Sequence, residues 1–211
     1  EISDLRVGYN RPHSKLIEKI PIASERLSLA ASIFGHLIPD GHWYRDPSEG
    51  TRIAGNLGHW LDLFLYLLNK ADRFPESIEV SISYLDKAQF DDNFCIGLST
   101  PLQDFMSIHF SSIAEPPEGV YESIMIQQES HVSQISDFRE VAVLTATSTT
   151  RYRAKVKDVG HSGSVLQVTM ASKRSRREIL AVSTLVVEIS NAVKEAKTEI
   201  SVSLADLLQM Q

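Results

Sequence analysis

The sequence predicts an α+β protein of one domain, in which a few helices cover one face of a large, open-faced and mostly antiparallel β-sheet. The first observation is a series of segments with period-2 alternation, joined by turn-like stretches such as AEPPEG at 114–119, which favours antiparallel pairing over repeated βαβ units. The second is that helical patterns are fewer and occupy three places. With 211 residues, 43% of them hydrophobic, the chain can bury a core as one domain or at most two small ones. No internal repeat or low-complexity linker divides the sequence, which favours a single domain.

The strand predictions rest on residues that alternate between apolar and polar. The stretch SIEVSISYL at 77–85 shows the pattern most clearly, because every second side chain from Ile78 to Tyr84 is apolar or aromatic, as in a strand with one buried face. The first ten residues also have the composition of a strand. Similar patterns predict strands over 27–34, 105–111, 120–127, 140–147 and 151–157.

Helices are predicted in three regions. Residues 12–20 begin with Pro12, a residue suited to the first helical turn, and place their apolar side chains on one side. A second helix is predicted from Thr51 to about Ala71, after the cap-and-turn signal of Asp46 and Pro47. The last region comprises 162–173 and 177–196, where many β-branched residues make poorer helix formers.

Charge and composition exclude several classes of protein. The chain has 21 Lys and Arg against 27 Asp and Glu, a formal charge of −6, which argues against a nucleic-acid or anionic-membrane surface. The one basic cluster, KRSRR at 173–177, is interpreted as a solvated loop or helix start. No apolar run reaches the ~20 residues of a membrane span. Because Cys95 is the single cysteine, neither an intrachain disulfide nor a Cys-based zinc site is expected, and we expect a reducing, cytoplasmic setting.

A polar stripe interrupts the most apolar helix. In GNLGHWLDLFLYLL at 55–68, the polar residues Asn56, His59 and Asp62 recur every three positions. At about 100° per residue they stay within one sector of roughly 120°. Burying unpartnered polar groups costs several kcal/mol, so this sector either meets partners in the core or faces a cleft. In a cleft, a histidine with a pKa near the usual ~6.5 can transfer a proton at neutral pH. Both alternatives stay open at this point.

Two stretches resemble a known family of enzymes. The segments RVGYNRPHSKLIEKI at 6–20 and GHWYRDPSEGTRIAGNLGHWLDLFLYLL at 41–68 resemble the C-terminal half of the glucose-fructose oxidoreductase, inositol dehydrogenase and MocA family. DVGHSGSVLQ at 158–167 resembles a later Gly-His segment of that family. The family pattern of His-Trp, Asp-Pro, Arg-Ile and Cys-His-Phe-Ile-Asp-Leu here reads His42-Trp43, Asp46-Pro47, Arg52-Ile53 and Gly58-His59-Trp60-Leu61-Asp62-Leu63.

The resemblance implies a C-terminal domain like that of glyceraldehyde-3-phosphate dehydrogenase and an NAD- or NADP-dependent hydride transfer. The substrate would be a sugar, nucleotide sugar or cyclitol, oxidised or reduced at a hydroxyl-bearing carbon. The family histidine beside the nicotinamide corresponds to His59, which would donate or accept the hydroxyl proton. The resemblance does not identify cofactor-binding residues in this chain, and no metal site is expected.

The resemblance also implies residues that contact the substrate. Arg11 and Arg52 match arginines near the family's cleft and would hold hydroxyl, carboxylate or phosphate groups, unless they serve surface or capping roles. Trp43 and Tyr44 would lie on the active-site loop, where they would meet a sugar ring or pack within the loop. The remaining substrate-side residues are Asn56 and Asp62. Asn56 departs from the family, which often has a carboxylate there that can share a proton.

The sequence lacks two features of the family. It contains no Gly-x-Gly-x-x-Gly after a strand and no Glu-Lys-Pro segment with the second catalytic group. The chain is therefore interpreted as the excised C-terminal domain of a longer enzyme, or as a short protein that has lost catalysis, and the 211 residues alone should not turn over substrate.

Two other functions remain open. The sheet could mediate association into a homo-oligomer, a dimer or tetramer, because strands such as SIMIQ and AVLTAT suit a covered face better than a solvated one. Alternatively, the chain could be a small-molecule-binding domain of unrelated ancestry.

Overall fold

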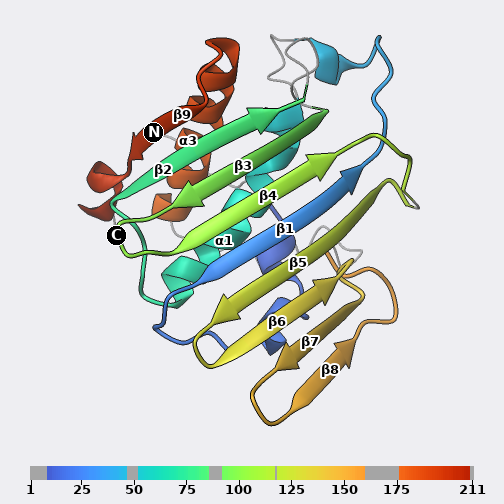
Figure 1. The fold of residues 1–211 in the computed structure, drawn as a ribbon, viewed down its shortest axis with the longest axis vertical. Helices are drawn as coiled ribbons and strands as arrows, with labels where there is room; N and C mark the ends of the chain where they lie inside the picture. The colour runs from blue at the N-terminus through green and yellow to red at the C-terminus, as the bar shows by residue number, and fades with distance from the viewer. Residues whose placement is uncertain (1–8, 47–51, 86–91, 117, 160–175, 210–211) are drawn as a thin grey trace.

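The protein contains one continuous β-sheet with its helices on one side (Figure 1). A computed structural model describes residues 9–46, 52–85, 92–116, 118–159 and 176–209. Within them nine strands pair in the order β8-β7-β6-β5-β1-β4-β3-β2-β9. The strands are β1 (Ser28–Gly35), β2 (Ser77–Tyr84), β3 (Asn93–Ser99), β4 (Phe105–Ser111), β5 (Val120–Gln128), β6 (His131–Ser136), β7 (Glu140–Leu144), β8 (Thr149–Arg153) and β9 (Glu199–Ser203).

All neighbouring strands are antiparallel except the central pair β1 and β4, which is parallel. The helices lie behind the sheet as viewed in Figure 1, so the other face is open. The predicted α+β fold with an open-faced, mostly antiparallel sheet is therefore confirmed. The helical segments are α1 (Gly58–Lys70), α3 (Arg176–Lys194), the π-helical η5 (Ile53–Leu57) and the 3₁₀ turns η1 (Arg11–His13), η2 (Ile17–Lys19), η3 (Trp43–Arg45) and η6 (Ala205–Gln209).

The core lies between the sheet and α1. Residues of the central strands alternate, so that Leu29 and Ile33 of β1 point to the helices while Ala30 and Phe34 point to the open face. Helix α1 is apolar on nearly all sides because the sheet covers one side of it and α3 packs against another. This arrangement places the beginning of α1, with His59, behind the central strands.

Several predicted elements differ from the observed ones. Residues 12–20 form two 3₁₀ turns rather than an α-helix, because Ser14 adopts an extended backbone (ψ 132°) and its hydroxyl accepts the N–H of Leu16. The strand predicted over 151–157 ends at Arg153, where the N–H of Ala154 turns to the carbonyl of Arg139. Strands β3, β6 and β9 were not predicted. The predictions for residues 1–8, 162–173 and most of the basic cluster lie outside the described residues.

The helix predicted over 51–71 is confirmed from Ile53 to Lys70, and α3 confirms the helix predicted over 177–196. None of the helices in the described part of the chain combines the length and the apolar character needed to cross a membrane.

Candidate functional site

The polar stripe lies at the beginning of the long helix, where five π-helical residues lead into α1. Asn56 and His59 are half-buried there, whereas Asp62 is buried one turn further along. A π-helical turn is rare in proteins and often occurs at functional sites. The stripe therefore divides into two half-buried residues and one that lies inside the protein.

Tyr9 lies against this part of the helix. Its ring centre is 5.4 Å from that of His59, with the two planes at 78°. A Cβ atom on Gly58 would lie only 2.3 Å from the Tyr9 hydroxyl oxygen, so the glycine allows the ring to lie directly against the helix backbone. The sequence prediction missed Tyr9, although it lies only two residues before Arg11 in a segment that carries the resemblance.

Burial raises the pKa of the Tyr9 phenol above its ordinary value, and the negative charge of Asp62 raises it further. A tyrosine hydroxyl is protonated at neutral pH even at its ordinary pKa, so Tyr9 can donate a hydrogen bond there. Tyr9 and His59 together present a phenol and an imidazole side by side at the start of α1.

An aromatic segment lies next to the π-helical turns. The Trp43 and Tyr44 rings are 4.0 Å apart between centres, and the Tyr44 hydroxyl donates to the Asn56 carbonyl oxygen at 3.4 Å. A Cβ on Gly55 would lie 3.0 Å from the Tyr44 ring, which shows how closely that ring approaches the helix. Trp43 is 54% exposed, so its ring offers an apolar surface beside the polar one. The structure thus brings three predicted substrate-side residues, Trp43, Tyr44 and Asn56, together.

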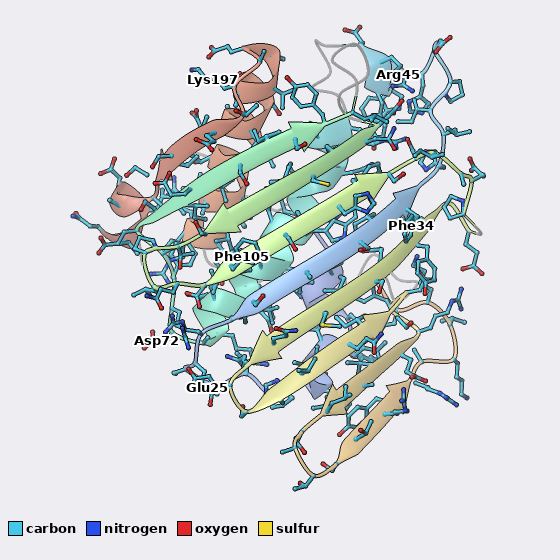
Figure 2. The ribbon with its side chains drawn as sticks, in the orientation of Figure 1. Glu25, Phe34, Arg45, Asp72, Phe105 and Lys197 are labelled. Carbon is cyan, nitrogen blue, oxygen red and sulfur yellow. The ribbon has the colours of Figure 1, made fainter. Side chains whose placement is uncertain are left out.

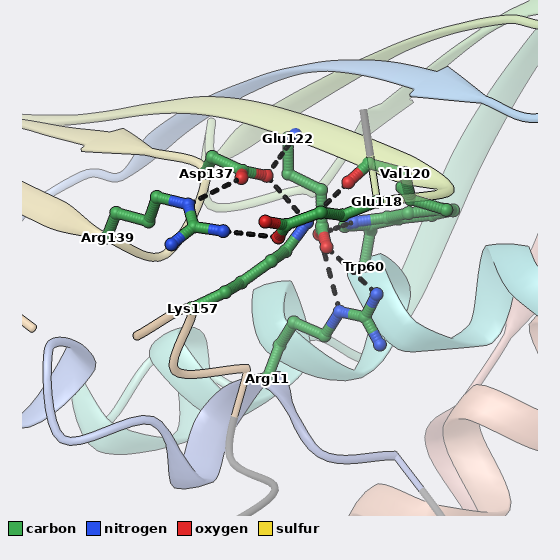
Figure 3. A network of polar contacts seen from close by, with 8 residues as sticks. All are labelled: Arg11, Trp60, Glu118, Val120, Glu122, Asp137, Arg139 and Lys157. Carbon is green, nitrogen blue, oxygen red and sulfur yellow. Dashed lines mark hydrogen bonds and ion pairs between the residues drawn. The ribbon is translucent and has the colours of Figure 1, made fainter. Parts of the chain in front are cut away.

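Arg11 lies in a different environment from the one predicted. Its guanidinium pairs with Glu122 of β5 at 2.9 Å and its Nη1 donates to Asn10 at 2.7 Å (Figure 3). Glu122 is fully buried and its carboxylate also accepts the Trp60 indole N–H at 2.7 Å. Because the Arg11 side chain is only 11% exposed, its charge is directed at Glu122 and at the Trp60 ring, whose centre is 5.7 Å away. This ion pair joins the N-terminal segment, β5 and α1.

A tight turn supports this network. Asp137 and Phe138 both have positive φ angles, 48° and 49°, in the turn between β6 and β7. The Asp137 carboxylate accepts the N–H of Glu122 at 3.2 Å and the Lys157 ammonium at 2.6 Å. Figure 3 shows Arg139 on the other side of the same carboxylate. Through charge-assisted hydrogen bonds, the turn therefore holds β5, the strand that carries the buried Glu122, in place.

Arg52 is 1% exposed and lies inside the protein. Its Nη2 donates to the His36 carbonyl at 2.6 Å, and its guanidinium carbon lies 5.0 Å from the centre of the Phe110 ring. The side chain thus fixes the beginning of the long helix to the end of β1. Contact of Arg11 or Arg52 with substrate stays a prediction, but both side chains already have partners in the protein.

Within the described residues no three His, Cys, Asp or Glu side chains are grouped as they would be around a metal ion. The predicted and newly found polar groups around the start of the long helix are the His59 imidazole, the Tyr9 and Tyr44 phenols, the Asn56 amide and the Trp43 indole. Donors and acceptors of these kinds can form hydrogen bonds with the hydroxyl groups of a polyhydroxylated molecule.

No family model matches the sequence, and a search of curated proteins finds no similar protein. Solved structures do share its fold. One is levoglucosan dehydrogenase in complex with NADH and levoglucosan, with 12% identity, a TM-score of 0.62, and coverage of 91% of this chain and 62% of that chain. Another is the dehydrogenase MviM from Clostridium difficile, with 14% identity, a TM-score of 0.57, and coverage of 89% and 62%.

A third is a super-repressor mutant of Gal80p from Saccharomyces cerevisiae, with 9% identity, a TM-score of 0.61, and coverage of 98% of this chain and 64% of that chain. The chain thus spans slightly less than two thirds of the length of these proteins. The sheet order and the helices behind it confirm the resemblance in fold: the chain has the fold of the C-terminal domain of oxidoreductases of the glucose-fructose oxidoreductase, inositol dehydrogenase and MocA type.

Proposed function

We propose that the chain is the substrate-side domain of an NAD- or NADP-dependent oxidoreductase that acts on a hydroxyl-bearing carbon of a sugar, nucleotide sugar or cyclitol. The observation that carries the proposal is the half-buried His59 at the start of α1, in ring contact with the protonated Tyr9. The complex of levoglucosan dehydrogenase with NADH and levoglucosan supports it, because that protein shares the fold.

In the proposed reaction, His59 moves the proton. A hydride leaves a carbinol carbon only as the hydroxyl proton leaves, so an imidazole within hydrogen-bond reach of that hydroxyl completes the reaction. The nicotinamide, when bound, accepts or supplies the hydride. The neutral Tyr9 hydroxyl donates a hydrogen bond beside the imidazole and helps to hold the substrate oxygen. Asp62 is buried, and its negative charge adds to the effect of burial in raising the pKa of Tyr9.

The other contacts with substrate are assigned to the aromatic segment and Asn56. The exposed Trp43 ring offers a flat apolar surface to the C–H face of a sugar, and the Asn56 amide offers hydrogen bonds to hydroxyl groups. Arg11 and Arg52 act as supports: one fixes α1 to β5 and the other fixes the helix start to β1.

The proposal requires a dinucleotide-binding domain, encoded with this chain or supplied by another subunit. The test is an assay for NAD and NADP reduction with a panel of sugars and cyclitols, on these 211 residues alone and on the longer reading frame that contains them. We expect turnover only when a dinucleotide-binding domain is present. Turnover by the 211 residues alone, or no nicotinamide binding by the longer protein, would contradict the proposal.

A second candidate function is association of two copies through the open face of the sheet. On the five central strands, β6, β5, β1, β4 and β3, the described open-face side chains include no Asp, Glu, Lys or Arg. Large apolar side chains, among them Phe34 and Phe105, are exposed there instead (Figure 2). A solvated face would normally carry charges, whereas an uncharged face can pack against its own copy. The fold also occurs in Gal80p, so it does not by itself establish catalysis.

Cys95 provides the test, because it is exposed on this face and is the only cysteine of the chain. We expect light scattering to show a dimer or larger oligomer at tens of micromolar protein, and alkylation of Cys95 to slow as protein concentration rises. A monomer whose Cys95 reacts at a rate independent of concentration would rule out this association.

A further inference from the structure

A basic cavity lies away from the helix that carries His59. It has a volume of about 590 Å³, within the range of small-molecule sites, and is formed by the N-terminal turns, strand β8 and the segment that follows β8. Among its lining residues Asp158 is the single acidic one. The basic residues that line it are Lys15, Lys19, Arg151, Arg153, Lys155 and Lys157.

Three of these six cations have carboxylate partners and three do not. Arg151 and Arg153 both pair with Glu140, and Lys157 pairs with Asp137. Within the part of the chain that the structure describes, the side chains of the other three form no ion pair. These are Lys15, Lys19 and Lys155. In a protein with a formal charge of −6, three lysines that form no ion pair with the described residues, gathered around one concavity, create a local positive potential that favours an anion.

Hydrogen bonds fix the walls of the cavity. The Asp158 carboxylate accepts the backbone N–H of Lys15 at 2.9 Å, which ties the N-terminal turns to the segment after β8. The N–H of Asp158 donates to the Phe138 carbonyl at 2.8 Å, and Lys157 is held by Asp137 at 2.6 Å. The cavity is therefore a preorganised part of the fold, which lowers the entropic loss on binding a ligand.

The lining is not exclusively ionic. Tyr152, Leu16 and Val156 also line it. A ligand that fits has a compact, doubly charged group for the lysines and a ring or carbon skeleton for the Tyr152 side. A long polyanion fits less well, because the chain has a net negative charge and one aromatic residue lines the cavity.

We propose that this cavity binds a small phosphate-bearing ligand of the sugar-phosphate class. Lys15, Lys19 and Lys155 hold the phosphate group, and Tyr152 contacts the uncharged part. The proposal does not depend on the oxidoreductase activity, because it uses no residue of the His59 site.

Calorimetric titration of the full chain with glucose 6-phosphate, inorganic phosphate and glucose tests the proposal. We expect saturable binding of glucose 6-phosphate at a Kd below about 1 mM, weaker binding of inorganic phosphate and none of glucose. The double variant Lys15→Gln/Lys19→Gln should bind glucose 6-phosphate at least about tenfold more weakly, since each lysine supplies a charge-assisted hydrogen bond.

The matched control is Lys70→Gln/Lys194→Gln, which removes the same charge at exposed positions outside the cavity and should leave the affinity within about twofold. Tyr152→Ala should weaken the binding of glucose 6-phosphate but not that of inorganic phosphate. His59→Ala should change the affinity for neither ligand. Thermal unfolding verifies that each variant is folded. No saturable binding, equal losses in the two double variants, or tighter binding of a single-stranded oligonucleotide or anionic vesicles would overturn the proposal.

Discussion

Asp62 and Tyr9 explain how the polar stripe of the long helix can end inside the protein. Asp62 is buried, and its charge adds to the effect of burial in raising the pKa of the Tyr9 phenol. Of the two alternatives that the sequence left open, core partners or a cleft, burial in the core applies to Asp62, and a cleft beside Asn56 and His59 stays a prediction. Asp62 lies in the core, while Asn56 and His59 are half-buried.

His131 is a buried histidine at the start of β6, and its Nδ1 lies 3.1 Å from the Ser130 hydroxyl oxygen. Burial lowers its pKa below the ordinary 6.5, although the nearby charge of Glu25 opposes this effect. The unfolded chain therefore binds the proton at a higher pH than the folded one. We predict that the free energy of unfolding, highest above pH 6.5, decreases as the pH falls through 6.5 toward the lower pKa of folded His131.

Urea unfolding between pH 7.5 and 5.0 measures this dependence. His131→Gln should reduce the slope of the free energy of unfolding against pH. An identical slope in the parent protein and in His131→Gln would show that His131 does not cause the dependence.

At the scale of single elements, Gly58 determines how Tyr9 lies against the long helix. We predict that Gly58→Ala destabilises the protein by about 1–3 kcal/mol, because the new methyl would overlap the Tyr9 ring. This net loss would occur although alanine favours helix by about 1 kcal/mol. Chemical denaturation measures the change. Gly41→Ala is the control, since a Cβ there has no atom within 4 Å. Equal stability of Gly58→Ala and the parent protein would contradict the observed Tyr9 position.

Glu122 joins β5 to α1 through Arg11 and Trp60. Replacing it with glutamine leaves the guanidinium of Arg11 nearly buried and without its counter-charge, so we predict a loss of about 3 kcal/mol in the free energy of unfolding. Glu188→Gln, at an exposed position on α3, should change stability by less than about 0.5 kcal/mol. Similar unfolding curves for these two variants would show that the ion pair contributes little to stability.

The elements differ in how well the sequence could predict them. The helix at 53–70 was predictable because fourteen mostly apolar residues at 55–68 leave no strand-like alternation. Strands β3 and β9 have seven and five residues, as do the predicted strands β4 and β7, so length does not set them apart; their neighbours in the sheet determine whether they pair. The residues at 12–20 have a helical pattern, but the local hydrogen bond of Ser14 interrupts it.

The candidate site was predictable in part, because some of its residues belong to a local sequence pattern. Motif positions indicated His59, Trp43, Tyr44 and Asn56, and the structure places the last three in contact and His59 one turn after Asn56. The partner of Arg11 lies 111 residues away on β5, so no local pattern could indicate that ion pair.

At the scale of the whole molecule, the sheet separates three surfaces. The helix side carries the His59 site, the opposite face is uncharged over its five central strands, and the basic cavity lies between the N-terminal turns and β8. The hydrogen bonds of Glu122 and Asp137 connect the His59 side to the basic cavity, because Lys157 both pairs with Asp137 and lines the cavity. One fold can thus support substrate chemistry, association and anion binding on separate parts of its surface.

The proton-transfer role of His59 is the central claim, and the pH dependence of kcat/KM in the protein with its dinucleotide-binding domain tests it most directly. For His59→Asn the account predicts a loss of about 10²–10⁴-fold in kcat/KM, disappearance of the ionisation near the pKa of imidazole, and unchanged affinity for the nicotinamide cofactor. A variant that retains kcat/KM within about twofold of the parent, with the same pH profile, would contradict it.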